Sequence, residues 1–311
     1  MASDSTPLIA VVGPTAVGKT GLAVALCQRF GGEVINADSR QVYRGMDIGT
    51  AKPTPEECSQ APHHLLDLLN PDENFGVGAF LPLAQAAASD IAGRDKLPIV
   101  AGGTGQYVWA LVEGQSVPAV PPNPELRAAL EQEAESLGSQ TLHDRLRDVD
   151  PARADALDHR NVRRVIRALE IHEATRQRPS EMAPPPATHG NHLVIGLTME
   201  RQALYERIDR RVDAMIEAGF LAEVQSLIEA GYPAGQGALD SPGYRELGLY
   251  LDGVLSLEEA VSRTKTQTHR LARRQYNWFK ANDPRISWLD ASDTGLVEHA
   301  TALVSAHPSQ G

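Results

Sequence analysis

The chain has 311 residues, of which 42% are hydrophobic, so it has the composition of an ordinary globular protein with room for about two domains. Two cysteines without a C-x-x-C pair or a Cys/His cluster exclude a disulfide framework and a structural zinc site. The formal net charge of −11 argues against a protein that simply coats nucleic acid. Residues 1–6 are polar and no apolar run reaches about 20 residues, so we expect a cytoplasmic protein without a membrane span.

The first predicted element is a strand over residues 8–12, followed by a phosphate-binding loop. Residues 13–20 match the pattern G-x-x-x-x-G-K-[ST] at every fixed position. The backbone N–H groups of such a loop point toward one spot, and the helix predicted over 18–30 directs its positive end there. The loop therefore predicts a polyphosphate ligand, as in ATP-binding proteins, but kinases, ATPases, switches and some transferases share it.

Each side chain of the loop has an expected place in this prediction. Lys19 supplies charge for the outer phosphates, and the Thr20 hydroxyl is placed to ligate a Mg²⁺ ion that bridges phosphate oxygens. Mg²⁺ is the only cofactor that the sequence predicts. The predicted diphosphate- or nucleotide-binding residues are Gly13, Pro14, Thr15, Ala16, Val17, Gly18, Lys19 and Thr20.

Strands and helices alternate up to about residue 115. Strands are predicted over 33–37 and 97–101, with a helix over 78–93 between them. This alternation predicts an α/β fold with a parallel sheet and helices on both faces. Ligands of such sheets gather at the carboxyl ends of the strands, where the phosphate loop, residues 38–41 and residues 102–104 are expected to lie.

Prolines divide the remainder of the chain. A proline-rich stretch over 117–124 ends the alternation, and Pro184–Pro186 precede a strand predicted over 192–199. Only helical patterns lie between them. We therefore expect three parts, namely a first core segment 1–117, a helical insertion 118–191 that hinges on its prolines, and a core completion 192–311. The last part is expected to contain helices at about 201–230 and 256–280 and a loose tail after about residue 304.

Two predicted helices carry basic faces in this otherwise acidic chain. Arg160, Arg163, Arg164 and Arg167 follow helical spacing on one side, with apolar residues opposite. Both faces are either solvated sides of structural helices or sites for phosphate backbones, which suit rows of arginine. The second face, on the 256–280 helix, consists of Arg263, Lys265, His269, Arg270, Arg273, Arg274 and Lys280. The opposite side of this predicted helix carries Leu257, Val261, Leu271, Trp278 and Phe279.

Asp38 is the obvious carboxylate at a strand end near the phosphate loop. A loop that transfers a phosphoryl group normally has a second carboxylate on the Mg²⁺ side at the end of another strand. The strand predicted over 97–101 ends in Gly-Gly-Thr instead. Three roles are therefore open for Asp38, which are metal ligand, general base, and a turn cap without chemical function.

Several sequence blocks in fixed order resemble one family, the bacterial tRNA dimethylallyltransferases, also called tRNA isopentenyltransferases or the IPP transferase family. The resemblance covers about residues 8–290 and departs from the family pattern at Val17 and Pro242. It implies a P-loop NTPase-like parallel sheet with flanking helices plus a mainly helical insertion domain that contacts tRNA. The matching blocks are residues 13–20, 38–43, 44–53, 62–67, 102–104, 243–246, 273–275 and 278–279.

The resemblance implies transfer of a dimethylallyl group from dimethylallyl diphosphate to N6 of the adenosine at tRNA position 37, with release of diphosphate. The loop and Mg²⁺ would then hold the leaving diphosphate. The adenine amine is a weak nucleophile because its lone pair is delocalised, so a base that accepts its proton is worth about 10²- to 10⁴-fold. Asp38 matches the family position of that base. The implied partners are the tRNA anticodon stem-loop and dimethylallyl diphosphate. We also expect no membrane partner and a monomeric protein.

Other residues take roles only through this resemblance. Thr104 and Arg127 match positions that line the reaction channel, and their alternatives are a turn hydroxyl and a surface cation. Residues 38–41 match a segment that handles the target nucleotide, whose adenine must leave the anticodon stack. Tyr244 either contacts tRNA or packs in the core. The implied tRNA-binding residues are Asp38, Ser39, Arg40, Gln41, Thr104, Arg127, Arg163, Arg164, Arg167, Gly243, Tyr244 and Arg245.

Three rival functions fit parts of the pattern. An adenylate isopentenyltransferase, which prenylates free adenosine phosphates, needs neither the basic faces nor the insertion. A small-molecule P-loop kinase fits the loop and predicts turnover of ATP to ADP. A nucleotide-gated RNA binder without catalysis fits the loop and the basic faces and predicts that Asp38→Ala leaves its function intact.

Overall fold

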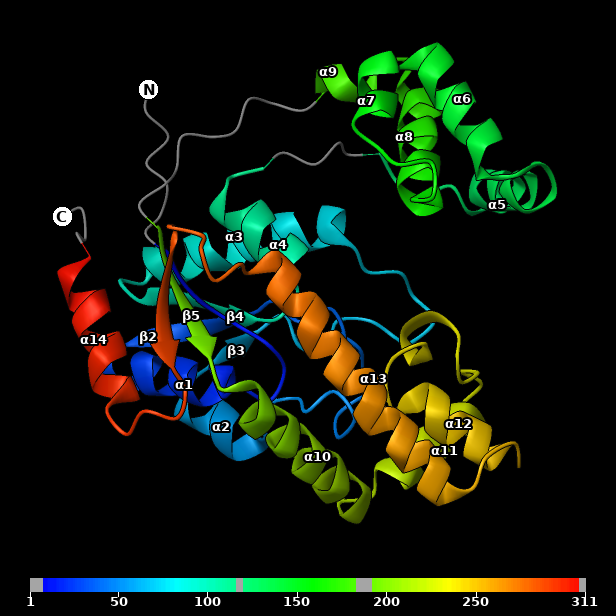
Figure 1. Cartoon of the computed structure of the whole chain (residues 1–311). Coiled ribbons are helices and arrows are strands. Elements are labelled where there is room, and N and C mark those ends of the chain that lie inside the picture. The colour runs from blue at the N-terminus through cyan, green and yellow to red at the C-terminus, as the bar shows by residue number, and fades with distance from the viewer. Residues whose placement is uncertain (1–7, 116–119, 183–191, 308–311) are drawn as a thin grey trace. The chain divides into compact units, whose positions relative to one another are not determined.

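The computed structural model describes residues 8–115, 120–182 and 192–307. The chain forms two compact units, one of Met1–Gly114 with Thr188–Gly311 and one of Gln115–Ala187 (Figure 1). The expected domain boundary at 117/118 and the run Pro184–Pro186 fall outside the described residues, and the boundary at 191/192 falls at their edge.

The larger unit is built on a six-stranded parallel sheet, as the alternating pattern predicted. The strand order is β3-β2-β4-β1-β5-β6, and every neighbouring pair is parallel. All residues of β1 and β2 are buried, because apolar strands of a parallel sheet are covered on both faces. The edge strands β3 and β6 were not predicted. The strands are β1 Leu8–Val12, β2 Gly32–Asn36, β3 His63–His64, β4 Leu97–Gly102, β5 His192–Thr198 and β6 Ile286–Asp290.

Helices flank this sheet and extend beyond it. The helix predicted over 201–230 is in fact two helices, because Gly219 adopts a left-handed φ of 101° between them. The tail expected to be loose after about residue 304 is helical as far as Ala306. The helices of this unit are α1 Lys19–Phe30, α2 Pro55–Gln60, α3 Val77–Gly93, α4 Gly105–Val112, α10 Arg201–Glu217, α11 Phe220–Glu229, α12 Tyr244–Leu251, α13 Leu257–Trp278 and α14 Leu296–Ala306. No helix among the described residues is long and apolar enough to cross a membrane.

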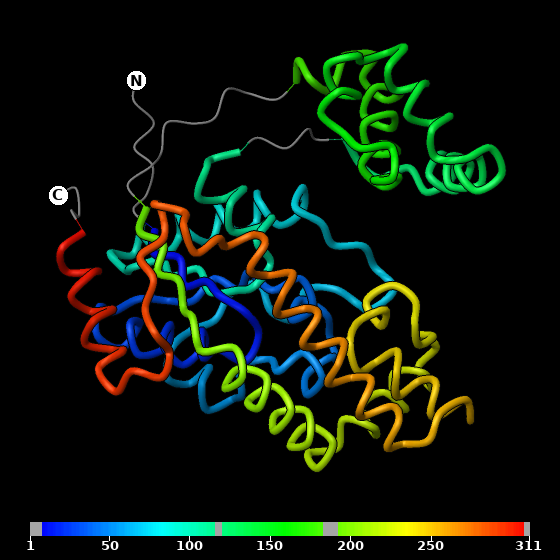
Figure 2. The backbone as a smooth tube through the Cα atoms, viewed as in Figure 1, coloured from blue at the N-terminus to red at the C-terminus, as the bar shows by residue number. Residues whose placement is uncertain are grey.

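A second core cluster lies apart from the sheet core and joins α11, α12 and α13 to the loop that follows β2. Helix α13 also runs beside α10 (Figure 2). At the end of α13, Trp278 is exposed and Phe279 is the capping residue, so the two do not share one buried face, contrary to expectation. The cluster therefore packs the loop after β2 against these helices. Its buried members include Val42, Tyr43, Met46, Phe220, Val224, Tyr244 and Leu247.

The smaller unit is entirely helical in its described part and has its own core. Arg160 lies before the start of α8 and pairs with Asp158, so it does not belong to the helical arginine face that the spacing predicted. Its helices are α5 Pro124–Leu137, α6 Ser139–Val149, α7 Pro151–Asp155, α8 Val162–Thr175 and α9 Pro179–Met182. Its core includes Leu130, Leu142, Leu146, Val165 and Leu169.

A buried carboxylate on α8 ties the smaller unit together. Glu170 is 1% exposed and accepts hydrogen bonds from Nε and Nη2 of Arg127, both at 2.8 Å, and from the backbone N–H of Asn123 at 2.6 Å. Arg167 also pairs with it. Burial alone would raise the pKa of Glu170, but these donors outweigh burial and lower the pKa to about 2.

We predict that Glu170→Gln destabilises the smaller unit by about 1–3 kcal/mol, because two arginines lose a buried partner while retaining some solvent contact. The matched control Glu173→Gln, on the same helix but half exposed, should cost less than about 1 kcal/mol. The folded-state pKa of Glu170 is depressed, so its contribution is present above about pH 5 and is lost as pH falls toward 2. Amide hydrogen exchange of α5–α8 in the full chain measures both effects. Equal losses in the two variants would contradict this account.

Candidate active site

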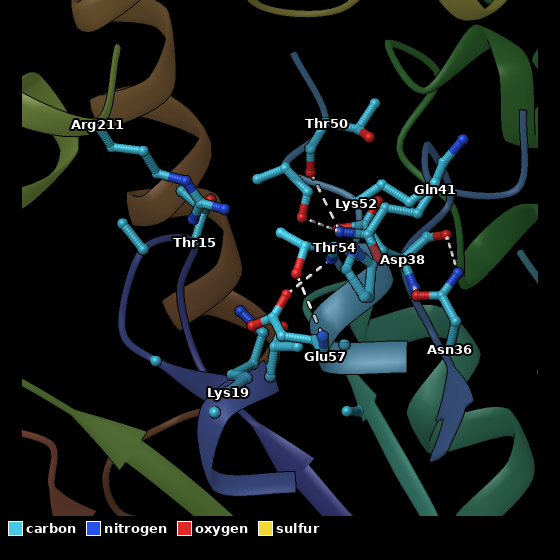
Figure 3. A pocket seen from close by; sticks show the side chains of 18 of the residues that line it. Thr15, Lys19, Asn36, Asp38, Gln41, Thr50, Lys52, Thr54, Glu57 and Arg211 are labelled. Atoms are coloured by element: carbon cyan, nitrogen blue, oxygen red, sulfur yellow. Dashed lines mark hydrogen bonds between the residues drawn. The ribbon is translucent and has the colours of Figure 1, made fainter. Parts of the chain in front are cut away.

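A cleft of about 1170 Å³ opens in the larger unit beside the carboxyl ends of β1, β2 and β4. Its walls come from the phosphate loop, the residues after β2, the segment 47–58 and one side of α10. Figure 3 shows Thr15, Lys19 and Arg211 on one side of it and Asp38, Gln41 and Thr50 on the other. The parallel sheet thus brings together parts of all three segments expected at its edge, namely the phosphate loop, residues 38–41 and residues 102–104.

The phosphate loop has the backbone that its glycines predicted. Gly13 has φ +141°, and a Cβ there would lie 2.5 Å from the carbonyl oxygen of Leu197. Gly18 has φ +108° and precedes the first turn of α1. Val17, one of the two departures from the family pattern, is 1% exposed, packs into the core and contributes to the wall of the cleft.

Three cations surround the start of α1. Lys19 Nζ donates to the carbonyl oxygen of Pro14 at 2.7 Å, and Arg207 reaches within 3.6 Å of where a Cβ of Gly18 would lie. Burial, with the charge of Arg211 acting in the same direction and Asp38 opposing it, lowers the pKa of Lys19 to about 8. Burial also lowers the pKa of Arg211. Neither arginine forms an ion pair with the described part of the chain, so an anion here would relieve their mutual repulsion.

Asp38 begins a tight turn after β2. Its Oδ1 accepts the backbone N–H of Arg40 at 2.8 Å, and its own N–H is donated to Asn36 Oδ1 at 3.0 Å. Asn36 Nδ2 also donates to the carbonyl of Asp38 at 3.2 Å. Asp38 therefore caps a turn, while no hydrogen bond joins its Oδ2 to any described residue. The carboxylate lines the cleft and interacts electrostatically with Lys19 and Arg211.

Thr104 is hydrogen-bonded to this turn. Its hydroxyl oxygen accepts the backbone N–H of Ser39 at 3.0 Å, so the turn-hydroxyl alternative describes what the structure shows. The preceding glycines are required for packing, since a Cβ at Gly102 would lie 2.2 Å from the carbonyl oxygen of Ala37. A role of Thr104 in the reaction channel stays a prediction.

Gln275 on α13 joins two edges of the cleft. It is 7% exposed, its Oε1 accepts the N–H of Thr15 at 2.7 Å, and its Nε2 donates to the carbonyl of Gly103 at 3.1 Å. The sequence indicated Gln275 only as part of a matching block, and gave no sign of Arg207 or Arg211. The one feature of the sequence that could have indicated them is their four-residue spacing on a predicted helix, which places both arginines on one side of that helix.

The segment after residue 46 forms the opposite wall. Lys52 pairs with Asp47 and Asp67 and donates to the carbonyl of Tyr43 at 2.8 Å. Gln41 Nε2 donates to the carbonyl oxygens of Thr50 and Ala51, at 3.1 and 3.0 Å. The wall is therefore fixed by hydrogen bonds to the residues that follow β2.

A smaller chamber of about 90 Å³ adjoins the cleft and shares Asp38 and Arg211 with it. Apolar side chains from α10, α11 and α13 form much of its lining. They include Ile208, Val212, Met215, Phe220 and Leu271. The arrangement places a small and largely apolar space next to a carboxylate and a guanidinium group.

The segment 243–245 lies differently from its prediction as a tRNA contact. Tyr244 is 1% exposed and its ring packs edge-on against Phe220 with centroids 4.9 Å apart, so the structure supports the alternative of a core ring. Gly243 is also buried, and Arg245 pairs with Asp240. Direct contact of Gly243 and Tyr244 with tRNA is not supported, because neither is accessible.

The four predicted arginines Arg127, Arg163, Arg164 and Arg167 belong to the smaller unit. Arg163 and Arg164 are exposed on α8 and form no ion pair with the described residues. Arg127 and Arg167 instead form ion pairs with Glu170.

Thr20, the predicted metal ligand, lines the cleft of the larger unit. Among the described residues, no group of three or more His, Cys, Asp or Glu is arranged to hold a metal ion.

Comparisons with known proteins agree with this architecture. The family model described as IPP transferase matches residues 41–282, and the model described as isopentenyl transferase matches residues 6–68. A tRNA dimethylallyltransferase of Roseiflexus sp. (strain RS-1) is 49% identical over 300 residues, which are 96% of this chain and 97% of the relative.

Solved structures show the same relationship. The tRNA isopentenylpyrophosphate transferase of Bacillus halodurans is 42% identical, with a TM-score of 0.72 and 97% of both chains covered. A eukaryotic dimethylallyltransferase acting on tRNA is 30% identical, with a TM-score of 0.84 over 99% of this chain and 81% of the other. The P-loop NTPase-like fold class is thereby confirmed. The chain belongs to the IPP transferase family, whose relatives named here are tRNA-modifying prenyltransferases.

Proposed function

We propose that this chain transfers a dimethylallyl group from dimethylallyl diphosphate to N6 of the adenosine at tRNA position 37 and releases diphosphate. The observation that carries the proposal is the cation cluster at the phosphate loop, which lies beside the carboxylate of Asp38 in one cleft. Membership of the IPP transferase family supports the same donor and acceptor classes. The reaction needs a site for a leaving anion next to a proton acceptor, and the cleft offers both.

The loop would bind the diphosphate through its backbone N–H groups and the first turn of α1. Lys19, Arg207 and Arg211 would neutralise the charge that develops as the allylic C–O bond breaks. Thr20 and the diphosphate oxygens fit a Mg²⁺ ion, since the Thr20 hydroxyl lines the cleft and has no hydrogen bond to the described residues. Such an ion would supply further charge neutralisation at the leaving group.

The acceptor amine would lie on the other side of the cleft. Asp38 would accept one N6 proton through Oδ2, because Oδ1 is already used by the turn. The apolar chamber would hold the five-carbon group between the diphosphate and this carboxylate. In this arrangement the new C–N bond forms while the C–O bond to diphosphate breaks, and the proton leaves on Asp38.

The smaller unit would bind tRNA. Arg163 and Arg164 are exposed cations without ion pairs to the described residues, which suits contact with a phosphate backbone. Arg127 and Arg167, oriented by Glu170, would contact phosphate with their remaining N–H groups. A free adenosine phosphate would not require these cations, which favours tRNA over AMP. A tRNA substrate also favours a cytoplasmic location, and the expected monomeric state stays a prediction.

We predict that radiolabelled dimethylallyl diphosphate labels bulk tRNA and not AMP when incubated with the protein and Mg²⁺. Asp38→Asn should reduce the rate about 10²- to 10⁴-fold while tRNA binding is retained, because only the proton acceptor is lost. The exposed Asp252→Asn serves as the matched control and should react as the wild type does. Label on AMP alone would indicate an adenylate prenyltransferase. Release of ADP from ATP alone would indicate a kinase, and unchanged turnover of Asp38→Asn would refute the base.

We predict that diphosphate affinity depends on pH through Lys19. Its pKa of about 8 in the free protein means that the ammonium form, which diphosphate prefers, is lost as pH rises through 8. Relative to Lys19→Arg, which stays charged, the affinity of the wild type should fall about tenfold per pH unit above 8. Calorimetric titration with inorganic diphosphate between pH 6.5 and 9.5 measures this ratio. Parallel profiles for the two proteins would contradict the assignment.

We predict that the chamber limits the length of the prenyl donor. Met215 lines both the cleft and the chamber, so Met215→Ala should raise kcat/KM for geranyl diphosphate relative to dimethylallyl diphosphate by about tenfold or more. Met215→Leu, which nearly conserves volume, should leave this ratio within about twofold. Competition between the two donors on tRNA gives the ratio directly. If Met215→Ala lowers both rates equally, the prenyl group does not occupy the chamber.

A further inference from the structure

The carboxylate of Glu223 lies outside the cleft and holds part of the cleft wall that faces the phosphate loop. This part consists of residues 47–51 and is called the wall segment below. Glu223 on α11 accepts the backbone N–H groups of Asp47 and Ile48 on Oε2, at 3.0 and 2.7 Å, and that of Gly49 on Oε1, at 3.1 Å. Three consecutive N–H groups therefore converge on a single side chain. A carboxylate satisfies such a set better than a neutral side chain, because charge strengthens each hydrogen bond.

Tyr244 completes the coordination of this carboxylate. Its hydroxyl donates to Glu223 Oε1 at 2.6 Å, and burial together with the charge of Glu223 raises the pKa of the phenol, so it stays a donor. The wall segment also rests on the aromatic pair, since a Cβ at Gly49 would lie 2.2 Å from the Phe220 ring and 2.6 Å from that of Tyr244. The buried Tyr244 therefore holds the wall segment in two ways, by the packing of its ring and by its hydrogen bond to Glu223.

The wall segment in turn fixes Gln41. The Nε2 group of Gln41 donates to the carbonyl oxygens of Thr50 and Ala51, directly after the residues that Glu223 holds. Because both acceptors are carbonyls, the amide orientation is set, and Oε1 is left as the group available to a ligand. Gln41 and Asp38 line the same cleft, in which Figure 3 shows them on the side opposite Lys19 and Arg211.

We propose that Glu223 and Tyr244 are positioning residues for the adenine that accepts the prenyl group. They act through the segment 47–51, which orients the Gln41 amide. This inference rests on the proposed function. The adenine amine carries two hydrogens, of which Asp38 would take one, and Gln41 Oε1 would accept a hydrogen bond from the other. A purine with a carbonyl at position 6 would instead present an acceptor to Oε1, so the same arrangement selects adenine.

A double-mutant cycle tests whether the effect passes through Gln41. Tyr244→Phe keeps the ring and removes only the donor to Glu223. We expect it to lower kcat/KM for tRNA about tenfold, the lower end for a hydrogen bond to a charged group, and to change KM for dimethylallyl diphosphate less than about twofold. In a Gln41→Ala background the same substitution should change kcat/KM for tRNA less than about twofold. A merely structural tyrosine would cost the same factor in both backgrounds, and that result would overturn the proposal.

The controls separate the remaining outcomes. Tyr250→Phe, which removes a hydroxyl from the same helix and the same core cluster, should leave both kinetic constants within about twofold. Glu223→Gln should repeat the Tyr244→Phe pattern with a larger factor, and if it fails to fold, the tyrosine cycle alone decides. An equal loss of donor and acceptor binding in Tyr244→Phe would also refute the proposal. Wild-type protein that transfers no prenyl group to tRNA would instead refute the proposed function.

Discussion

The structure depends on positive charge gathered where a helix begins. Lys19, Arg207 and Arg211 surround the first turn of α1, and none of them forms an ion pair with the described part of the chain. Burial lowers the pKa of Lys19 to about 8, because a charge kept partly out of water is costly. A bound polyanion removes that cost. The arrangement therefore favours a charged leaving group over a neutral ligand. It is a local concentration of positive charge in a chain whose formal net charge is −11.

Close backbone approaches hold the other reacting groups against this charge. Gly102 lets the end of β4 touch the carbonyl of Ala37, which brings the Asp38 turn next to the phosphate loop. Gln275 links the same region to the phosphate loop through hydrogen bonds to both Thr15 and Gly103. A carboxylate and an anion site are thus positioned by rigid strand ends, with a small apolar chamber beside them. The proposed transfer of a prenyl group to adenine requires such an arrangement.

Local patterns explain what could be predicted from the sequence. The apolar run over 8–12 and the fixed glycine and lysine positions depend on near neighbours alone, so β1, the loop and α1 were predicted closely. Arg207 and Arg211 were missed because only tertiary packing turns that side of α10 toward the loop. Arg160 was placed on a helix that in fact begins at Val162. Residue periodicity does not locate the first residue of a helix to within two residues.

Long-range contacts also decide which polar residues are free. Arg167 follows the spacing of exposed Arg163 and Arg164, yet it turns to the buried Glu170, a partner that spacing does not reveal. In the proposed reaction the phosphate loop binds the diphosphate while Asp38 accepts a proton from the acceptor amine. A crystal structure with an unreactive thio analogue of dimethylallyl diphosphate and an anticodon stem-loop tests it most directly. We expect diphosphate on the loop, with adenine N6 about 3–3.5 Å from the donor carbon and within hydrogen-bond reach of Asp38. Diphosphate bound elsewhere, or an Asp38 carboxylate turned away from N6, would contradict it.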